Sequence, residues 1–136
     1  MQSNDKSVTG GCLCGAVRFS VELPSKWCAH CHCTMCRRAH GAGYVTWVGF
    51  GDSHFRLDQG EEDLRWFSSS SDAERGFCSR CGSTMLFRSA RWAGEMHVAL
   101  ASIEGPIDRK PQANVFHDTR VEWMPLDDAL AVFNPE

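Results

Sequence analysis

All but one of the eight cysteines in this 136-residue chain fall into three short clusters, and this clustering constrains the fold more than any other feature. The clusters are Cys12-x-Cys14, Cys31-x-Cys33-x-x-Cys36 and Cys78-x-x-Cys81. Such close spacing is typical of metal coordination rather than of a disulfide framework. The polar start of the chain, MQSNDKSVTG, has no hydrophobic signal core and predicts a cytoplasmic protein, where disulfides are rare.

Composition predicts one ordinary globular domain. Hydrophobic residues make up 43% and charged residues 23% of the chain, a balance common in globular proteins. The formal net charge of −3 argues against nucleic acid as the main partner, and no apolar run approaches the length of a membrane span. We expect a flexible segment at residues 1–7 and a single domain at 8–136; a homo-oligomer is compatible with these observations.

The polar and apolar patterns predict short strands. Residues 17–21 alternate between apolar and polar side chains, as in a half-buried strand. Residues 44–50 are rich in β-branched and aromatic residues, and further strands are expected at 85–88 and 96–100. Residues 55–57 and 64–67 suggest a hairpin. Helix is expected only in a turn leading into 37–40 and at 126–133. The prediction is a mainly β fold of antiparallel sheets with little helix.

Two of the clusters together supply four ligands for one metal. Cys78 and Cys81 precede Gly82, which suits a tight turn whose amides point at the thiolates. Cys12 and Cys14 would present both sulfurs on one face if they lay in an extended strand. Four cysteines form a common structural zinc site, which would stabilise the fold by its binding free energy.

The third cluster lies in the stretch HCHCTMCRR at residues 30–38. In an extended strand Cys31 and Cys33 face one way, whereas His30 and His32 face the other. Cys36 reaches the same metal if the chain turns after Cys33. Three protein ligands are typical of a catalytic zinc that keeps one position for an exchangeable ligand.

Spacing alone leaves a rival interpretation open, because Cys28-x-x-Cys31 is also a C-x-x-C pair. A closed site of four cysteines would then form from this segment and would be structural. In the first interpretation, Cys28 is a buried free thiol.

Other polar residues have less specific signals. His97 is polar within an apolar strand and is the histidine that we would test first. Arg37 and Arg38 are either a solvated face or cations placed for the carboxylates of a substrate.

Three motifs resemble one known family. GGCLCGAVRF at residues 10–19, HCHCTMCRRAHGA at 30–42 and RGFCSRCGSTMLFR at 75–88 are similar to the glutathione-dependent formaldehyde-activating enzyme family, which also includes centromere protein V. The resemblance extends over about residues 8–133. It implies a zinc-binding β-tent fold with two zinc ions per chain. The implied structural zinc ligands are Cys12, Cys14, Cys78 and Cys81, and those of the second, catalytic zinc are Cys31, Cys33 and Cys36. The family motif has no cysteine at the position of Cys28, which favours the open site.

The resemblance also implies an activity. The family joins glutathione and formaldehyde reversibly into S-hydroxymethylglutathione and is therefore a carbon–sulfur lyase in the breaking direction. The expected substrates are a thiol such as glutathione and formaldehyde or another small aldehyde. Because three thiolates make zinc a weak Lewis acid, thiol activation is favoured over carbonyl polarisation. The alternative is a non-catalytic binding module with two structural zinc sites.

Overall fold

Two β-sheets and one short helix make up the computed structural model, which describes residues 6–135. The smaller sheet has the order β1-β2-β5, formed by β1 (Ser7–Gly11), β2 (Arg18–Glu22) and β5 (Phe55–Gln59). The larger sheet has the order β11-β10-β3-β4-β9-β8-β7-β6. Its strands are β3 (Trp27–Cys31), β4 (Val45–Gly51), β6 (Leu64–Ser70), β7 (Ala73–Cys78), β8 (Thr84–Ser89), β9 (Glu95–Ala99), β10 (Ala113–Val115) and β11 (Ala131–Phe133). The prediction of a mainly β fold is confirmed.

The single α-helix of the described residues, α1 (Thr34–His40), follows β3 directly. It is longer than the turn predicted from the sequence and is capped at both ends. Cys33 accepts the N–H of Cys36 at its N-terminus, and Gly41 ends it with a left-handed φ of 61°. Glycine adopts this conformation without the steric cost that a Cβ atom brings. The helix therefore begins and ends at fixed points, and it carries Cys36 back toward Cys31.

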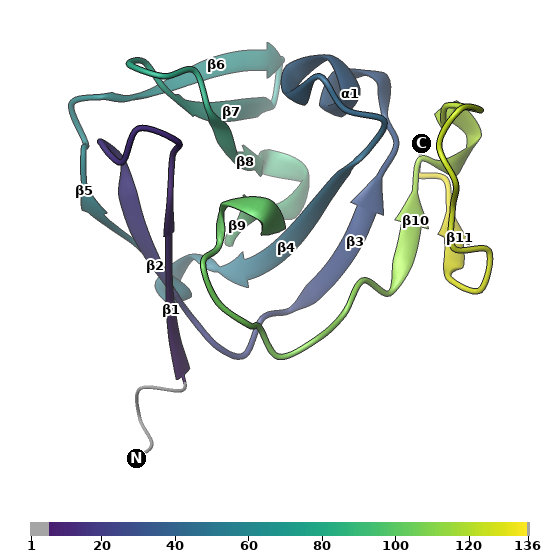
Figure 1. Cartoon of the computed structure of the whole chain (residues 1–136), viewed down its shortest axis with the longest axis horizontal. Helices are drawn as coiled ribbons and strands as arrows, with labels where there is room; N and C mark the ends of the chain where they lie inside the picture. Colours follow the sequence, from purple (N-terminus) through teal and green to yellow (C-terminus); the bar gives the residue numbers. More distant parts are fainter. Residues whose placement is uncertain (1–5, 136) are drawn as a thin grey trace.

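The predicted hairpin between residues 55–57 and 64–67 is wrong. β5 pairs with β2, whereas β6 pairs with β7, so the two segments belong to different sheets (Figure 1). Phe55 and Leu57 lie opposite Val21 and Phe19 of β2, which gives β5 a buried apolar partner outside the hairpin. The polar turn at 60–63 thus carries the chain from one sheet to the other.

The predicted helix at 126–133 is also wrong. Residues 131–133 form β11, which runs parallel to β10, and β10 runs parallel to β3. These two short strands form an arm at one edge of the large sheet (Figure 1). Asp127 caps a turn by accepting the N–H of Ala129, and the β-prone pair Val132 and Phe133 follows. The strand pairings of β10 with β3 and β11 are the parallel exceptions to the antiparallel expectation.

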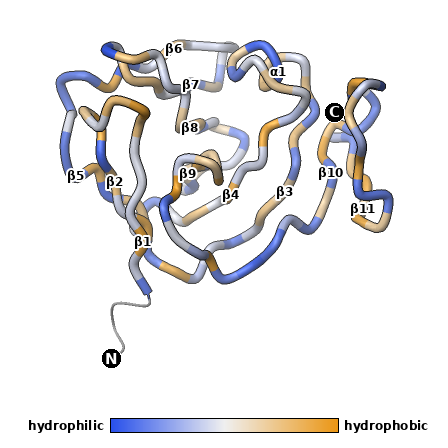
Figure 2. Tube along the Cα trace, in the orientation of Figure 1, coloured by the Kyte–Doolittle hydropathy of each residue, from blue (hydrophilic) through white to orange (hydrophobic). Residues whose placement is uncertain are grey.

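Buried side chains form two clusters on opposite faces of the large sheet. In β4, Val48 and Phe50 point into the main core against the smaller sheet, whereas Val45 and Trp47 point into a second cluster that includes Cys36. Because side chains alternate along a strand, one strand serves both clusters. Hydrophobic stretches, orange in Figure 2, occur on strands of both sheets.

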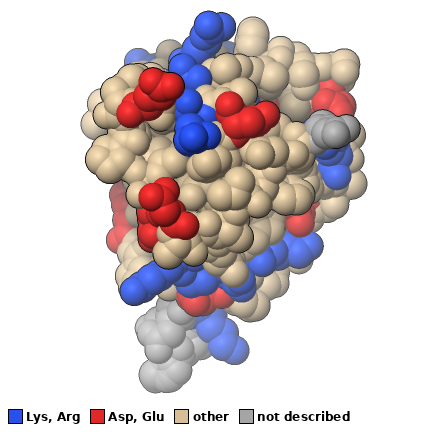
Figure 3. All heavy atoms as spheres, turned by 90° about the vertical axis from the view of Figure 1, so that its right-hand side faces the viewer, with Lys and Arg blue, Asp and Glu red and all other residues tan. Residues whose placement is uncertain are grey.

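The predicted flexible segment covers residues 1–7, but β1 already begins at Ser7. Residues 1–5 of that segment lie outside the described residues. Over residues 6–135, no helix is long and apolar enough to cross a membrane. On the face that carries the arm, charged side chains of both signs are spread around a wide uncharged area (Figure 3).

Candidate metal centres and the adjoining pocket

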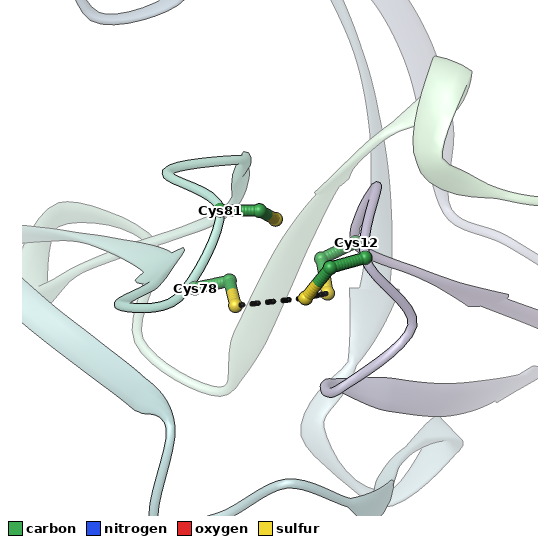
Figure 4. A group of neighbouring side chains, drawn as sticks. Cys12, Cys78 and Cys81 are labelled. Carbon is green, nitrogen blue, oxygen red and sulfur yellow. Dashed lines mark hydrogen bonds between the residues drawn. The ribbon is translucent and has the colours of Figure 1, made fainter.

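Cys12, Cys14, Cys78 and Cys81 come together from two turns that are far apart in the sequence. Their sulfurs all lie within 4.8 Å of one another. The Sγ atoms of Cys12 and Cys14 are 3.7 Å apart, and those of Cys14 and Cys78 are 3.8 Å apart. Figure 4 shows the side chains of Cys12, Cys78 and Cys81 converging between the two chain segments.

Each turn positions its sulfurs with backbone amides. Arg80 donates its N–H to Cys78 Sγ at 3.3 Å, and Gly82, with a φ of 81°, closes the turn by donating to the carbonyl of Cys78. Cys12 and Cys14 follow the end of β1 and lie in a turn rather than in the extended strand assumed from the sequence. Their sulfurs meet because the chain bends, and Val17 donates its N–H to Cys12 Sγ at 3.3 Å.

These distances fit a tetrahedral zinc. A Zn–S bond of about 2.3 Å places neighbouring sulfurs of a tetrahedron about 3.8 Å apart. The separations of 3.7 and 3.8 Å agree with that spacing. The donor set of four thiols is also the one that structural zinc prefers. The four cysteines thus form a cluster that could hold a metal.

Cys31, Cys33 and Cys36 form a second cluster, with sulfurs within 4.8 Å of one another. Cys31 ends β3, Cys33 caps α1, and Cys36 lies in its first turn. The Sγ atoms of Cys36 and Cys31 are 3.4 Å apart, and Cys36 donates its N–H to Cys33 Sγ at 3.2 Å. Hydrogen bonds from the thiols of Cys31 and Cys36 lower the pKa of Cys33. The end of β3 and the capped start of α1 thus bring three sulfurs together.

Cys28 lies on the other face of β3. Its side chain is 1% exposed and packs in the main core, whereas Cys31 packs against the second cluster. The two residues are three apart in a strand, so their side chains point to opposite faces. Burial raises the pKa of the Cys28 thiol to about 11. The rival four-cysteine site that includes Cys28 is therefore not formed.

The two histidines of HCHC contact other partners. His30 Nδ1 is 2.9 Å from the hydroxyl of Thr46, and His32 Nε2 is 2.8 Å from the side-chain oxygen of Asn114. Both imidazoles also pack against the ring of Tyr44. The structure thus places both rings away from the three sulfurs.

Two side chains that the sequence did not single out contact Cys36. Trp47 donates its indole N–H to Cys36 Sγ at 3.4 Å, and Arg75 Nη1 lies 3.6 Å from the same sulfur. Arg75 is 6% exposed and stacks on the ring of Phe87 at 4.9 Å. Its Nε atom is buried without a hydrogen-bond partner among the described residues. Only the pairing of β7 with β8 brings Arg75 to this face, since Arg75 lies opposite Phe87 in that register.

A cavity of about 410 Å³ adjoins the three-cysteine cluster, and Cys31, Cys33 and Cys36 all line this cavity. Six of the other fourteen lining residues are Trp or Phe, and Cys28 of β3 is also among the fourteen. Neither Arg37 nor Arg38 is among the described residues that line it; Arg37 instead donates to the carbonyl of Thr119. The cation at this cavity is therefore Arg75, not the arginine pair suggested by the sequence.

His97 lines the same cavity and is almost fully buried. Its Nε2 is 2.9 Å from Glu95 Oε1, which also accepts the indole N–H of Trp27 at 3.2 Å. Burial lowers the pKa of His97, and the hydrogen bond to Glu95 opposes that shift only in part. Burial also acts to raise the pKa of Glu95, but the hydrogen bonds from His97 and Trp27 bring it below its usual value. The pair is therefore a neutral imidazole on an ionised carboxylate near pH 7.

Known proteins that are similar to this chain indicate its family. Residues 7–119 match the model of the glutathione-dependent formaldehyde-activating enzyme family. A Halomonas elongata protein provisionally named glutathione-dependent formaldehyde-activating enzyme is 32% identical over 129 residues, covering 87% of this chain and 80% of that protein. A Schizosaccharomyces pombe protein named an uncharacterized lyase is 31% identical over 78 residues, which cover 57% of this chain and 55% of that one.

A solved structure is similar as well. The crystal structure of a Rhodobacter sphaeroides protein is 30% identical, with a TM-score of 0.63 and coverage of 72% of this chain and 89% of that one. The family match covers most of the chain and includes all seven clustered cysteines. The chain therefore belongs to the glutathione-dependent formaldehyde-activating enzyme family.

Proposed function

We propose that this protein is a zinc-dependent carbon–sulfur lyase, which joins a thiol such as glutathione to formaldehyde or another small carbonyl compound and reverses that step. One observation carries the proposal: the three-cysteine cluster lines a cavity large enough for a small molecule. The forward reaction forms a carbon–sulfur bond, opens the carbonyl double bond and moves the thiol proton to the resulting alkoxide oxygen.

Cys31, Cys33 and Cys36 would hold the catalytic zinc, and Cys12, Cys14, Cys78 and Cys81 would hold a structural one. When bound at the three-cysteine site, zinc would favour the thiolate form of a substrate thiol, which is the nucleophilic form. The protein's own residues then have to balance charge, move a proton and position both reactants.

Arg75 and Trp47 balance the charge of this site. Three thiolates around a divalent ion carry one surplus negative charge, which is costly in a buried place. Arg75 brings a buried positive charge beside Cys36, and Trp47 adds a hydrogen bond to the same sulfur. Hydrogen bonds to thiolates stabilise the charged form, so both side chains favour the deprotonated cluster.

His97 is suited to move the proton. With Nε2–H donating to Glu95, the Nδ1 atom of His97 is left as an acceptor. The pKa lowered by burial keeps this imidazole neutral near pH 7, so it can take a thiol proton and return it to an alkoxide. Glu95 fixes the ring's tautomer and stabilises the protonated form. Its hydrogen bond from Trp27 holds the carboxylate in place.

The direct test measures how fast the adduct forms and breaks. Zinc-loaded protein should accelerate exchange between glutathione plus formaldehyde and S-hydroxymethylglutathione, as read by exchange NMR. Cys33→Ala should abolish the acceleration while circular dichroism stays that of the folded protein. Met35→Ala is the matched control and should keep the activity, since Met35 is exposed on α1 and is not among the described residues that line the cavity. If zinc-loaded protein leaves the exchange rate unchanged, glutathione and formaldehyde are not its substrate pair; if it accelerates no thiol–aldehyde pair, the non-catalytic binding module is favoured instead.

A further inference from the structure

Aromatic rings form a continuous wall from the three-cysteine cluster to the far end of the cavity. Trp47, whose indole N–H contacts Cys36, lies 5.9 Å from Phe87 between ring centroids. Phe87 in turn lies 5.6 Å from His97, and His97 contacts Trp27 edge-on at 4.6 Å. Separations of this size are those of interacting aromatic pairs.

Gly49 makes room for one part of this wall. It lies opposite Trp27 in the β3–β4 pairing, and a Cβ atom at Gly49 would overlap the indole of Trp27. The indole of Trp27 therefore covers the bare backbone of β4. Because any larger residue would move the ring, Gly49 fixes how deep the cavity is at this point.

The arm supplies two further aromatic side chains to the cavity wall. Phe116 and Phe133 both line the cavity, and Phe116 donates its backbone N–H to the carbonyl of Phe133 at 2.7 Å. Phe116 has a left-handed φ of 56°, which is unusual for a residue with a Cβ atom. Strained conformations of this kind persist at ligand sites, where the surrounding structure holds them. Here that conformation belongs to a residue of the cavity wall.

The charges of the cavity do not match a tripeptide. Glutathione carries two carboxylates and an ammonium, and each would need a partner in an apolar site. Arg75 is the cationic side chain among the described lining residues, and one of its nitrogens already contacts Cys36. Its Nε atom is buried and has no hydrogen-bond partner among the described residues, so Arg75 offers little to further charged groups of a ligand. Formaldehyde alone is too small to contact the aromatic walls.

We propose that the substrate of this site carries an aromatic ring that lies against the aromatic side chains of the cavity wall. The ring belongs either to an arylmethyl thiol or to an arylaldehyde, because both place a ring next to the new carbon–sulfur bond. This inference rests on the proposed function for the reaction, but the ring-binding site itself does not depend on turnover.

Binding is tested with two thioethers that cannot react. Benzyl methyl sulfide and butyl methyl sulfide are titrated calorimetrically into zinc-loaded protein. The aryl compound should bind about tenfold more tightly, the difference expected of one good aromatic contact. Gly49→Ala should remove that preference by displacing Trp27. Gly51→Ala is the control, since a Cβ there meets no atom within 4 Å. Equal affinities in the wild type, or an unchanged preference in folded Gly49→Ala, would overturn the proposal.

If Gly49→Ala does not fold, Trp92→Ala takes its place. Trp92 lines the cavity and lies 5.6 Å from His97, and Trp123, which is 72% exposed, gives the matched control. Loss of the aryl preference in Trp92→Ala but not in Trp123→Ala would support the site, and retention in both would overturn it.

Turnover measurements then show whether the thiol or the aldehyde carries the aromatic ring. Benzyl mercaptan with formaldehyde and glutathione with benzaldehyde are each compared with glutathione and formaldehyde. One aryl pair should exceed the reference in kcat/KM by about tenfold. If the reference pair is the fastest, the aryl specificity is wrong. If no pair is accelerated, the proposed lyase activity fails, and the thioether titration alone decides the ring-binding site.

Discussion

The residues in and around the three-cysteine cluster differ in how well the sequence alone predicts that they belong to the site. The cysteines themselves are evident, because thiols at such spacing are typical of metal ligands. His97 also stands out as a polar residue in an apolar strand, and the structure places it in the cavity. Arg75 gives no such signal. Its contact with Cys36 depends on the pairing of β7 with β8, which no local pattern encodes.

His97→Gln should lower kcat for adduct formation about a hundredfold, the usual contribution of a general base. Glutamine keeps a hydrogen-bonding side chain at this position, but it cannot take a proton. Exchange NMR gives the rate, and zinc content should stay that of the wild type because His97 is not among the clustered ligands. Unchanged kcat in a variant that still holds its zinc would remove His97 from the mechanism.

His40 makes stability depend on pH. Burial, helped by the charge of Arg75, lowers the pKa of His40 to about 4, and its ring packs edge-on against Trp47. A histidine in the unfolded chain titrates near about 6.5. Because the folded form takes up its proton less readily, the stability is fully present above pH ~6.5 and is lost as pH falls toward about 4.

Zinc-loaded His40→Asn should therefore lose less unfolding free energy than the wild type over that pH window. Denaturant unfolding of both proteins at each pH checks this. His54→Asn serves as a control, because the His54 ring lies elsewhere, with its Nδ1 atom 2.9 Å from the carbonyl oxygen of Glu22. If the unfolding free energies of the wild type and His40→Asn change in parallel with pH, the pKa of His40 does not cause the loss of stability.

At the scale of elements, alternation and capping place the ligands. β3 sends Cys31 to the cavity face and Cys28 to the core, and this outcome follows from their spacing of three in one strand. That rule applies only once the extent of β3 is known, because the spacing also allows a C-x-x-C turn. The C-terminal strand β11 is not evident from the local pattern, which favours a helix, since the pairing of β11 with β10 is non-local.

Gly41→Ala should destabilise the protein by about 1 kcal/mol, the cost of a Cβ atom in a left-handed conformation. Gly41 ends α1 with a φ of 61° and has open space around it, so strain rather than a clash causes the loss. Denaturant unfolding measures the change. Gly51→Ala, in open space without a left-handed φ, should cost less; equal losses would show that the cap is not the cause.

At the scale of the whole molecule, the two clusters lie in different positions, and we expect different roles for them. The four-cysteine cluster joins the β1–β2 turn to the β7–β8 turn and so ties the two sheets together. The three-cysteine cluster lies within one continuous segment and adjoins the cavity. Under the proposed function, a zinc in the first should therefore stabilise the fold, whereas a zinc in the second should support the reaction.

Zinc content, measured by elemental analysis together with thermal unfolding, tests this division most directly. The wild type should hold two zinc ions per chain. Cys33→Ala should hold one and unfold cooperatively within a few degrees of the wild type, whereas Cys81→Ala should unfold at a much lower temperature. One zinc in the wild type, or equal destabilisation by the two substitutions, would contradict the assignment of one structural and one catalytic centre.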